Sequence, residues 1–283
     1  MRKSSGGPNG AAAALTQPFR PIAFPNLAFG RAWAGTVRLL VTGGASGLGR
    51  AIALGAAERG ARVAIADIDR AGGEAVARAC GGHELAVDLI AEPERAVEDG
   101  AKLLGGLDVL VNNAGYGAAE AFLDMRAETW DRTLGLNVKA LALMSAAAGR
   151  IMRAQKSGRI VNITSPASRM ALPNYTAYAA SKAAVDAITR AAAVALAPHG
   201  IRVNSVAPGM MDTPMQRATE QELARIEGRN DVAAFLAERT ARIPLGRRIE
   251  PEEVAKTVLW LAFDAPDYIT AERLNVSGGL DKD

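Results

Sequence analysis

Three polar side chains in the middle of the chain have types and spacing suited to proton transfer. Tyr178 and Lys182 lie four residues apart, and Ser165 lies thirteen residues before Tyr178. Because an α-helix has 3.6 residues per turn, a helix over 178–197 would place Tyr178 and Lys182 on one face. A nearby cation favours the ionised form of an acid, so we expect Lys182 to lower the pKa of Tyr178. Such a phenol could exchange a proton with an alcohol or a carbonyl whose oxygen Ser165 holds.

The Tyr-x-x-x-Lys spacing alone does not establish a site, since such pairs are often ordinary neighbours on a helix. Stronger evidence comes from the N-terminal half. The apolar run 38–42 predicts a strand, and a glycine-rich turn and an alanine-rich helical stretch follow it. Gly43, Gly47 and Gly49 would let the backbone turn tightly and approach a pyrophosphate, which the start of the helix attracts through its free N–H groups.

An acidic residue stands where a dinucleotide site needs one. The run 62–67 predicts a second strand, and it ends in Asp67, about twenty residues after the glycines. Its carboxylate could accept hydrogen bonds from ribose hydroxyls. The glycine spacing is G-x-x-x-G-x-G rather than G-x-G-x-x-G, but the order of strand, turn, helix, strand and acid favours a dinucleotide site.

The rest of the chain repeats this alternation of strands and helices without a break, which favours one α/β domain. In open parallel sheets, ligands bind beyond the carboxyl ends of the strands. The glycine turn, Asp67, Asp88, Asn113 and Ser165 all lie at such ends. Further strands are predicted at 85–89, 107–111, 159–164, 201–206 and 273–276.

The composition argues against several classes of protein. Hydrophobic residues make up 49% of the chain, yet no apolar run approaches the roughly 20 residues needed to cross a bilayer. The single cysteine, Cys80, cannot form an internal disulfide, which fits a reduced, cytoplasmic setting. With only His83 and His199 besides it, we expect no metal site. The net charge is +3; the basic residues are scattered and much of their excess lies in the N-terminal segment, so we expect neither a nucleic-acid nor a membrane partner.

The first residues differ from the rest of the chain. Residues 1–37 contain four basic residues and no acid, and they are rich in glycine, alanine and proline without periodicity. We expect a flexible N-terminal extension over 1–35, although basic, acid-poor segments also occur as transit peptides. The remaining 36–283 would form the domain. Five apolar side chains of the extension could pack on the body or on a second subunit: Phe19, Phe24, Leu27, Phe29 and Trp33.

Taken in order, these motifs closely resemble those of the short-chain dehydrogenase/reductase (SDR) family. The resemblance covers roughly 36–279. It implies a single Rossmann-type, doubly wound parallel sheet of about seven strands with helices on both faces. It also implies a nicotinamide cofactor and hydride transfer on an alcohol or carbonyl without metal. The motifs that carry it are the glycine turn Thr42 to Gly49, Asn112-Asn113-Ala114-Gly115, Asn137, Ser165, Tyr178 with Lys182, and Pro208-Gly209.

By this resemblance, four residues form the catalytic set. Tyr178 would be the general acid and base, and Lys182 would lower its pKa and bind the nicotinamide ribose. Ser165 would fix the substrate oxygen, and Asn137 would hold a water that links Lys182 to solvent. Asn112 more plausibly braces the sheet. The cofactor-binding residues would be Gly43, Ser46, Gly47, Leu48, Gly49, Asp67, Asp88, Leu89, Asn113, Ala114, Gly115, Tyr178, Lys182, Pro208, Gly209, Met211 and Thr213.

The C-terminal third suggests the substrate. Residues of about 210–250 are helical and charged, and we expect them to form a mobile lid. This lid and the segment 208–215 are similar to those of polyol and sugar-alcohol members. The predicted function is therefore NAD-dependent hydride transfer between a secondary alcohol and nicotinamide. A polyol or a sugar alcohol is the favoured substrate. One alternative is a 3-oxoacyl-thioester (acyl-carrier-protein) reductase, and a second is a non-catalytic NAD-binding regulator.

The residues around Asp67 predict NAD over NADP. A carboxylate at this position would repel a 2′-phosphate, and neither Ile68 nor Ser46 offers the cation that a phosphate needs. The resemblance further implies a homo-oligomer, with a tetramer favoured. Its contact would use the alanine-rich helix 178–197 and a preceding helix over about 129–153.

The sequence departs from the family pattern at three positions. Pro166 follows Ser165 where a residue with an N–H is usual, which could reshape the substrate loop. Near the C-terminus, Ala271 and Ser277 replace the usual glycine and aspartate.

Overall fold

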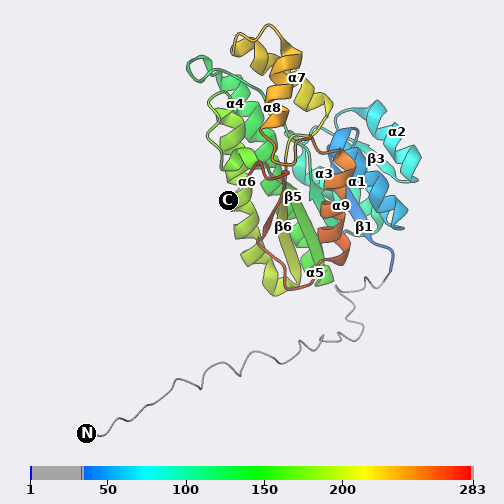
Figure 1. Ribbon diagram of the computed structural model, residues 1–283. Coiled ribbons are helices and arrows are strands. Elements are labelled where there is room, and N and C mark those ends of the chain that lie inside the picture. The colour runs from blue at the N-terminus through cyan, green and yellow to red at the C-terminus, as the bar shows by residue number, and fades with distance from the viewer. Residues whose placement is uncertain (2–32, 34, 282–283) are drawn as a thin grey trace.

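The fold is a single parallel sheet with helices on both faces. The computed structural model describes Met1, Trp33 and residues 35–281. All strand pairs are parallel, in the order β3-β2-β1-β4-β5-β6-β7, which confirms the predicted doubly wound sheet (Figure 1). The strands are β1 (Arg38–Thr42), β2 (Arg62–Asp67), β3 (His83–Ala86), β4 (Val109–Asn112), β5 (Gly158–Ile163), β6 (Ile201–Pro208) and β7 (Arg273–Val276).

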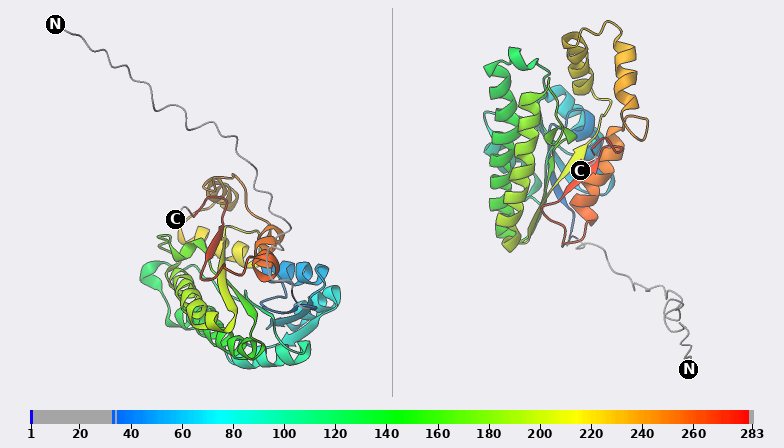
Figure 2. Two further views of the ribbon diagram at one scale, coloured as in Figure 1. Left: turned by 90° about the horizontal axis from the view of Figure 1, so that it is seen from below. Right: turned by 60° about the vertical axis from the view of Figure 1, so that its left-hand side comes forward.

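The helices form two layers, one on each face of the sheet (Figure 2). On one face α1 packs against α2 and α9, and on the other α5 packs against α3 and α6. The helices are α1 (Gly47–Glu58), α2 (Arg70–Cys80), α3 (Pro93–Leu104), α4 (Ala127–Leu134), α5 (Leu141–Gln155), α6 (Thr176–Leu196), α7 (Pro214–Ile226), α8 (Val232–Ala241) and α9 (Pro251–Leu259).

Strand β1 shows why the central strands are apolar throughout. Leu39, Leu40 and Val41 are all fully buried. Because successive side chains of a strand point to opposite faces, Leu39 and Val41 pack in the cluster under α1 and α9, whereas Leu40 packs in the cluster under α3 and α5. A strand covered on both faces needs a continuous apolar run rather than an alternating one.

The third predicted strand is displaced. It was expected over 85–89, but β3 ends at Ala86. The strand is at the edge of the sheet and pairs only with β2, and the last pair is Asp67 with Ala86. Because β2 ends at Asp67, Asp88 and Leu89 have no strand beside them and lie in the loop that follows.

The helix predicted over about 129–153 is not a single regular helix. Between α4 and α5, residues Gly135–Ala140 form a π-helical segment that contains Asn137. A π-segment adds a residue to the turn, and such segments occur often at functional sites.

Two helices stand apart from these layers. Helices α7 and α8 lie above the carboxyl ends of the strands, at the top of Figure 1. They belong to the segment 210–250 that the sequence predicts as a lid. Their buried side chains, among them Leu223 and Phe235, form a small apolar cluster separate from the two clusters of the sheet.

Most of the predicted N-terminal extension lies outside the described residues, including Phe19, Phe24, Leu27 and Phe29. Trp33 is described, and it packs against the core cluster under α1 and α9. The guanidinium carbon of Arg159 lies 5.7 Å from the centre of the Trp33 ring. Among the described residues, no helix combines the length and apolarity needed to cross a membrane.

Among the described residues, two that are not glycine have a left-handed backbone, Lys156 and Ala271, with φ values of +55° and +66°. Ala271, which precedes β7, has a φ of +66°, and its N–H donates to the carbonyl of Val203 over 2.9 Å. A left-handed backbone costs a residue with a Cβ roughly 1–2 kcal/mol, whereas glycine adopts it freely. This is the position where the sequence has alanine in place of the glycine usual in the family.

We therefore expect Ala271→Gly to stabilise the protein by about 0.5–1 kcal/mol, because relief of strain exceeds the added chain entropy of glycine. The midpoint of denaturant unfolding should rise accordingly. Ala75→Gly, at an exposed site within α2, is the matched control and should destabilise by about 1 kcal/mol. A lower midpoint for Ala271→Gly would contradict the strain at this position.

Candidate functional site

A cavity of about 730 Å³ opens at the carboxyl ends of the strands, on the side where α7 and α8 lie. Chain order reverses between β1 and β4, which neighbour each other at the centre of the sheet. Such a switch point leaves a crevice, because the chain leaves the two strands in opposite directions. The cavity extends from the glycine turn after β1 to the two helices of the lid.

The glycine turn is shaped by close contacts that exclude side chains. Gly43 and Gly47 have φ values of +64° and +51°. A Cβ on Gly43 would lie 2.8 Å from the Cα of Ala114, and a Cβ on Gly49 would overlap the carbonyl oxygen of Gly43. The backbone itself therefore forms this wall of the cavity, which is what the approach of a pyrophosphate requires.

Hydrogen bonds hold the turn against the end of β4. The hydroxyl oxygen of Thr42 accepts from the N–H groups of Asn113 and Ala114, over 3.1 and 3.0 Å. The side-chain amide of Asn113 donates to the carbonyls of Thr42 and Gly43, both over 2.9 Å. Asn113 thus braces the glycine turn. Its predicted position beside the adenosine of the cofactor stays a prediction. Asn112 braces the sheet as expected, through Ser145 and Asn162.

Asp67 lies at the end of β2 and lines the cavity. One carboxylate oxygen accepts from the N–H of Ala45 over 2.9 Å, and the other accepts from the N–H of Asp69 over 3.0 Å. These bonds fix the carboxylate beside the glycine turn. Asp88 also lines the cavity and accepts from the N–H of Ile90 over 2.9 Å. It does not cap α3, whose N-cap is Glu92.

Ser165 lies two residues after the end of β5 and is the N-cap of a short 3₁₀ helix, Pro166–Ser168. Its hydroxyl oxygen accepts from the N–H of Ala167 over 3.2 Å. Pro166 occupies the first position of the turn, where an N–H would have no partner, so the proline fits without disturbing the loop. An effect of Pro166 on the substrate loop stays a prediction.

Ser165 and Tyr178 are hydrogen-bonded to each other across the cavity wall. Burial raises the pKa of Tyr178, and the hydrogen bond with Ser165 only partly offsets that increase. The structure thus contradicts the sequence prediction of a lowered pKa for Tyr178. The physical reason is that loss of water around the phenol disfavours the phenolate more strongly than its neighbours favour it.

Lys182 lies beside the tyrosine but is directed elsewhere. Its ammonium donates to the carbonyl of Ile163 over 2.9 Å and lies 5.6 Å from the centre of the Tyr178 ring. Burial lowers the pKa of Lys182 to about 8, although the charge of Asp186 acts in the opposite direction. The predicted i,i+4 neighbours therefore meet on α6, and each is shifted toward its neutral form by burial.

Asn137 is buried behind this pair and does not line the cavity. Its side-chain oxygen accepts from the N–H of Tyr116 over 2.8 Å. Its amide nitrogen donates to the carbonyl of Tyr116 and to the hydroxyl of Ser181, over 2.8 and 3.0 Å. The hydroxyl of Ser181 in turn donates to the backbone carbonyl of Tyr178 over 2.7 Å. Asn137 is thus linked to the backbone that carries the tyrosine.

Sequence reasoning missed a buried arginine that supports Ser165. Arg273, on β7, donates to the carbonyl of Ser165 over 3.1 Å. It forms ion pairs with Asp281 at 2.6 Å and Asp186 at 3.4 Å. Ser277, which replaces the usual aspartate, accepts from the N–H of Asp281 over 3.2 Å. The carboxylate at 281 thereby reaches Arg273, although position 277 has none.

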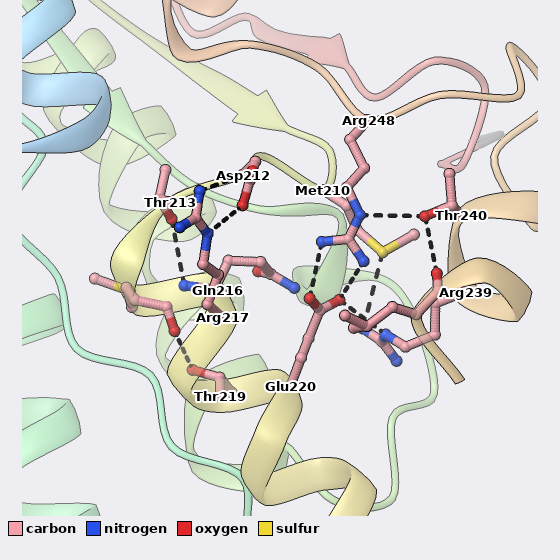
Figure 3. Close-up of polar contacts among 12 residues, drawn as sticks. Met210, Asp212, Thr213, Gln216, Arg217, Thr219, Glu220, Arg239, Thr240 and Arg248 are labelled. Atoms are coloured by element: carbon pink, nitrogen blue, oxygen red, sulfur yellow. Dashed lines mark hydrogen bonds and ion pairs between the residues drawn. The ribbon is translucent and has the colours of Figure 1, made fainter. Parts of the chain in front are cut away.

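The lid is held together by a buried carboxylate. Glu220 on α7 is 1% exposed and accepts hydrogen bonds from Arg239 on α8 and from Arg248 in the loop before α9 (Figure 3). Burial acts to raise the pKa of Glu220, but hydrogen bonds with Arg248, Gln216 and Arg239 lower it overall. This ion cluster joins α7, α8 and the loop before α9 to one another within the predicted lid; the mobility of the lid stays a prediction.

The cavity brings together every predicted site residue except Gly49, which is buried in α1, and Asn137. The missed residues lie mainly on the substrate side. Tyr175, one turn before Tyr178, and Arg239 and Arg242, three residues apart on a predicted helix, had spacings that could have indicated them. Other missed lining residues are Ile68, Val87, Ile90, Tyr116, Gly117, Arg132, Met170, Leu172, Met210, Gln216, Thr219 and Leu280.

Comparison with known proteins agrees with this geometry. A family model described as enoyl-(acyl carrier protein) reductase matches residues 43–281. Cis-4-hydroxycyclohexanecarboxylate dehydrogenase of Sinomonas cyclohexanicum is 40% identical over 248 residues, covering 85% of this chain and 94% of the relative.

Two solved structures are also similar. NAD⁺-bound xylitol dehydrogenase has a TM-score of 0.80 at 31% identity, covering 86% of this chain and 98% of that one. Actinorhodin polyketide ketoreductase with NADPH has a TM-score of 0.83 at 31% identity, covering 89% of this chain and 100% of that one. The chain therefore belongs to the short-chain dehydrogenase/reductase family of nicotinamide-dependent oxidoreductases, which act on alcohol and carbonyl groups.

Proposed function

We propose that this protein uses NAD to interconvert a secondary alcohol and its ketone, with Tyr178 as the general acid and base. The observation that carries this proposal is the hydrogen-bonded pair of Ser165 and Tyr178 in the wall of the cavity. The pair shares that cavity with a turn that only glycine can form. A hydroxyl bound between Ser165 and Tyr178 would therefore lie in the same space as a cofactor whose pyrophosphate is at the turn.

The residues present fit a dinucleotide. Gly43 and Gly47 leave the backbone exposed to a pyrophosphate at the start of α1, Gly49 allows the close packing of α1 against the turn, and Asp67 lies where the adenosine ribose would be. Asp88, Leu89, Asn113 and Ala114 would border the adenosine. Pro208, Gly209, Met211 and Thr213 would border the nicotinamide end. When bound, nicotinamide supplies the acceptor or donor of the hydride.

In this proposal, Ser165 donates a hydrogen bond to the substrate oxygen and Tyr178 takes the proton of the alcohol. Lys182, which lies beside Tyr178, would bind the nicotinamide ribose and stabilise the phenolate when it forms. Asn137 would act indirectly, by positioning the backbone of Tyr116 and the hydroxyl of Ser181, and by supporting a proton relay through water.

For the substrate, we propose a polyol, a sugar alcohol or a related secondary alcohol. The similarity to xylitol dehydrogenase supports this choice. A 3-oxoacyl-thioester reductase is the alternative, favoured by the similarity to a 3-oxoacyl-[acyl-carrier-protein] reductase of Thermotoga maritima, which is 36% identical over 250 residues. The similarity to cis-4-hydroxycyclohexanecarboxylate dehydrogenase means that carboxylated alcohols should also be tested as substrates. The presence of Asn137, Ser165, Tyr178 and Lys182 together argues against a non-catalytic NAD-binding regulator.

We further propose a division of the chain into an N-terminal extension, 1–35, and a catalytic domain, 36–283, whose lid spans about 210–250. We also propose a homo-oligomer and favour a tetramer. The contact between subunits would be formed by α5 and α6. Val194 on α6 is 75% exposed, and an apolar side chain on the surface of this helix supports such a contact.

Replacement of the proposed acid and base tests the mechanism. Tyr178→Phe should lower kcat by about 100-fold to 10,000-fold while NAD still binds, because a positioned proton donor contributes that much to the rate. Tyr175→Phe is the matched comparison, since its ring lies 6.4 Å from that of Tyr178 and also lines the cavity. Tyr175→Phe should lower kcat much less than Tyr178→Phe does. Near-normal turnover by Tyr178→Phe, measured with any alcohol substrate, would contradict the assignment.

The pH profile tests the role of Ser165. Alcohol oxidation needs the phenolate of Tyr178, whose pKa is raised by burial and lowered in part by the bond with Ser165. We expect kcat/KM for oxidation to rise with pH above 7, and Ser165→Ala to shift that rise to higher pH. Ser168→Ala, a hydroxyl in the same turn, should leave the midpoint in place. An unchanged midpoint in Ser165→Ala would argue against this hydrogen bond in the active enzyme.

Cofactor choice tests the placement of Asp67. Its carboxylate should bind the ribose hydroxyls of NAD and repel the 2′-phosphate of NADP, so kcat/KM should favour NAD by at least about tenfold. Asp67→Ser should lower the ratio of kcat/KM with NAD to kcat/KM with NADP. Glu74→Gln, which removes an acid of α2 that does not line the cavity, should preserve it. Equal kcat/KM values for the two cofactors in the unmodified enzyme would refute the placement.

A further inference from the structure

The substrate side of the cavity contains two arginines that the proposed reaction does not use. Arg239 lies in the last turn of α8, and Arg242 caps the end of that helix. Both line the cavity, beside Met210, Met215 and other largely apolar side chains. The side chain of Arg239 is only 19% exposed, and a guanidinium so far removed from water is costly unless an anion accompanies it, whereas Arg242 is exposed.

Arg239 has more hydrogen-bond donors than the protein satisfies. Its Nε donates to Glu220 over 3.1 Å. Within the described part of the chain, its one other side-chain hydrogen bond goes to the sulfur of Met210 at 3.9 Å, and a thioether is a weak acceptor. The guanidinium also lies over Phe235, 5.6 Å from the ring centre, which fixes its plane. The group is thus rigidly held, with donors still available.

The charges on this side do not balance. Glu220 is one carboxylate shared by two arginines, Arg239 and Arg248, so the cluster in Figure 3 keeps a net positive charge. Arg242 adds another, and among the described residues no acidic group forms an ion pair with it. The acidic residues that line the cavity are Asp67 and Asp88, which both lie at the opposite, adenosine end.

Tyr175 lies near both Tyr178 and Arg239. Its ring centre is 6.4 Å from that of Tyr178, and the charges of Arg239, Glu220 and Glu227 act on its phenol. Burial raises the pKa of Tyr175 to about 12, so this residue stays neutral and contributes no negative charge. A small molecule with its hydroxyl at Tyr178 would therefore extend toward the arginines.

We infer that Arg239 and Arg242 bind a carboxylate of the substrate, and hence that the substrate is a hydroxy acid whose hydroxyl and carboxylate lie at opposite ends. This inference rests on the proposed function and narrows its substrate class from neutral polyols to carboxylated secondary alcohols. Arg239, held by Glu220, supplies fixed donors, while the exposed Arg242 closes over the anion. Charge-assisted bonds of this kind are stronger than neutral ones, and more so in an apolar wall.

The experiment compares two substrates that differ only in charge. With the full chain and saturating NAD, kcat/KM is measured for cis-4-hydroxycyclohexanecarboxylate and for its uncharged carboxamide. The acid should be preferred by at least about tenfold. Arg242→Gln, at an exposed position, should reduce this preference to near unity. Arg225→Gln is the matched control, since Arg225 is a lid arginine on α7 that does not line the cavity; it should retain the preference.

A binding measurement separates failure of this inference from failure of the proposed function. Calorimetry with the NAD complex should show that cyclohexanecarboxylate, which cannot react, binds more tightly than cyclohexanecarboxamide, and that Arg242→Gln removes the difference. Turnover of neutral alcohols without any preference for the acid would overturn the inference and leave the proposed function intact. Preference for a phosphopantetheine thioester over the carboxylate would also overturn it, by assigning the arginines to a phosphate.

Discussion

The site depends on the contact between the glycine turn and the end of β4. Gly43 approaches Ala114 so closely that no side chain fits between them, and Thr42 and Asn113 fasten the two segments with four hydrogen bonds. These strands are neighbours in space because the chain order reverses at this point. Without this contact, the floor of the cavity between the two halves of the sheet would not form.

Burial is the second constraint, and it acts on the chemistry. Tyr178 and Lys182 are both shifted toward their neutral forms by loss of water, and Ser165 is the neighbour that favours the phenolate. Glu220 shows the opposite outcome, because two arginines keep a buried carboxylate ionised. Loss of water therefore favours the neutral forms of Tyr178 and Lys182, whereas Glu220, which is also buried, stays ionised because two arginines pair with it.

Much of this arrangement could be predicted from the sequence. The central strands are continuous apolar runs, and the residues at their ends have types that only a ligand site explains; the glycine turn, Asp67, Ser165 and Tyr178 accordingly line one cavity. Local spacing could not predict the pKa of Tyr178, because it depends on how deeply the phenol is buried. It also could not predict Arg273 beside Ser165 or Glu220 between two arginines. Those contacts join segments that are distant in sequence.

The support of Ser165 by Arg273 has a consequence for how the protein folds. Ser165 follows β5, whereas Arg273, Asp186 and Asp281 come from β7, α6 and the segment after β7. The contact of Arg273 with Ser165 joins residues 108 positions apart, and non-local contacts of this kind form slowly because their loops must close first. The glycine turn also needs a non-local contact, between Thr42 and Asn113, which are 71 positions apart, but that contact lies within β1 to β4 and does not involve β7. A ribosome-bound chain that has not yet released β7 can therefore organise its glycine turn while the serine still lacks its brace.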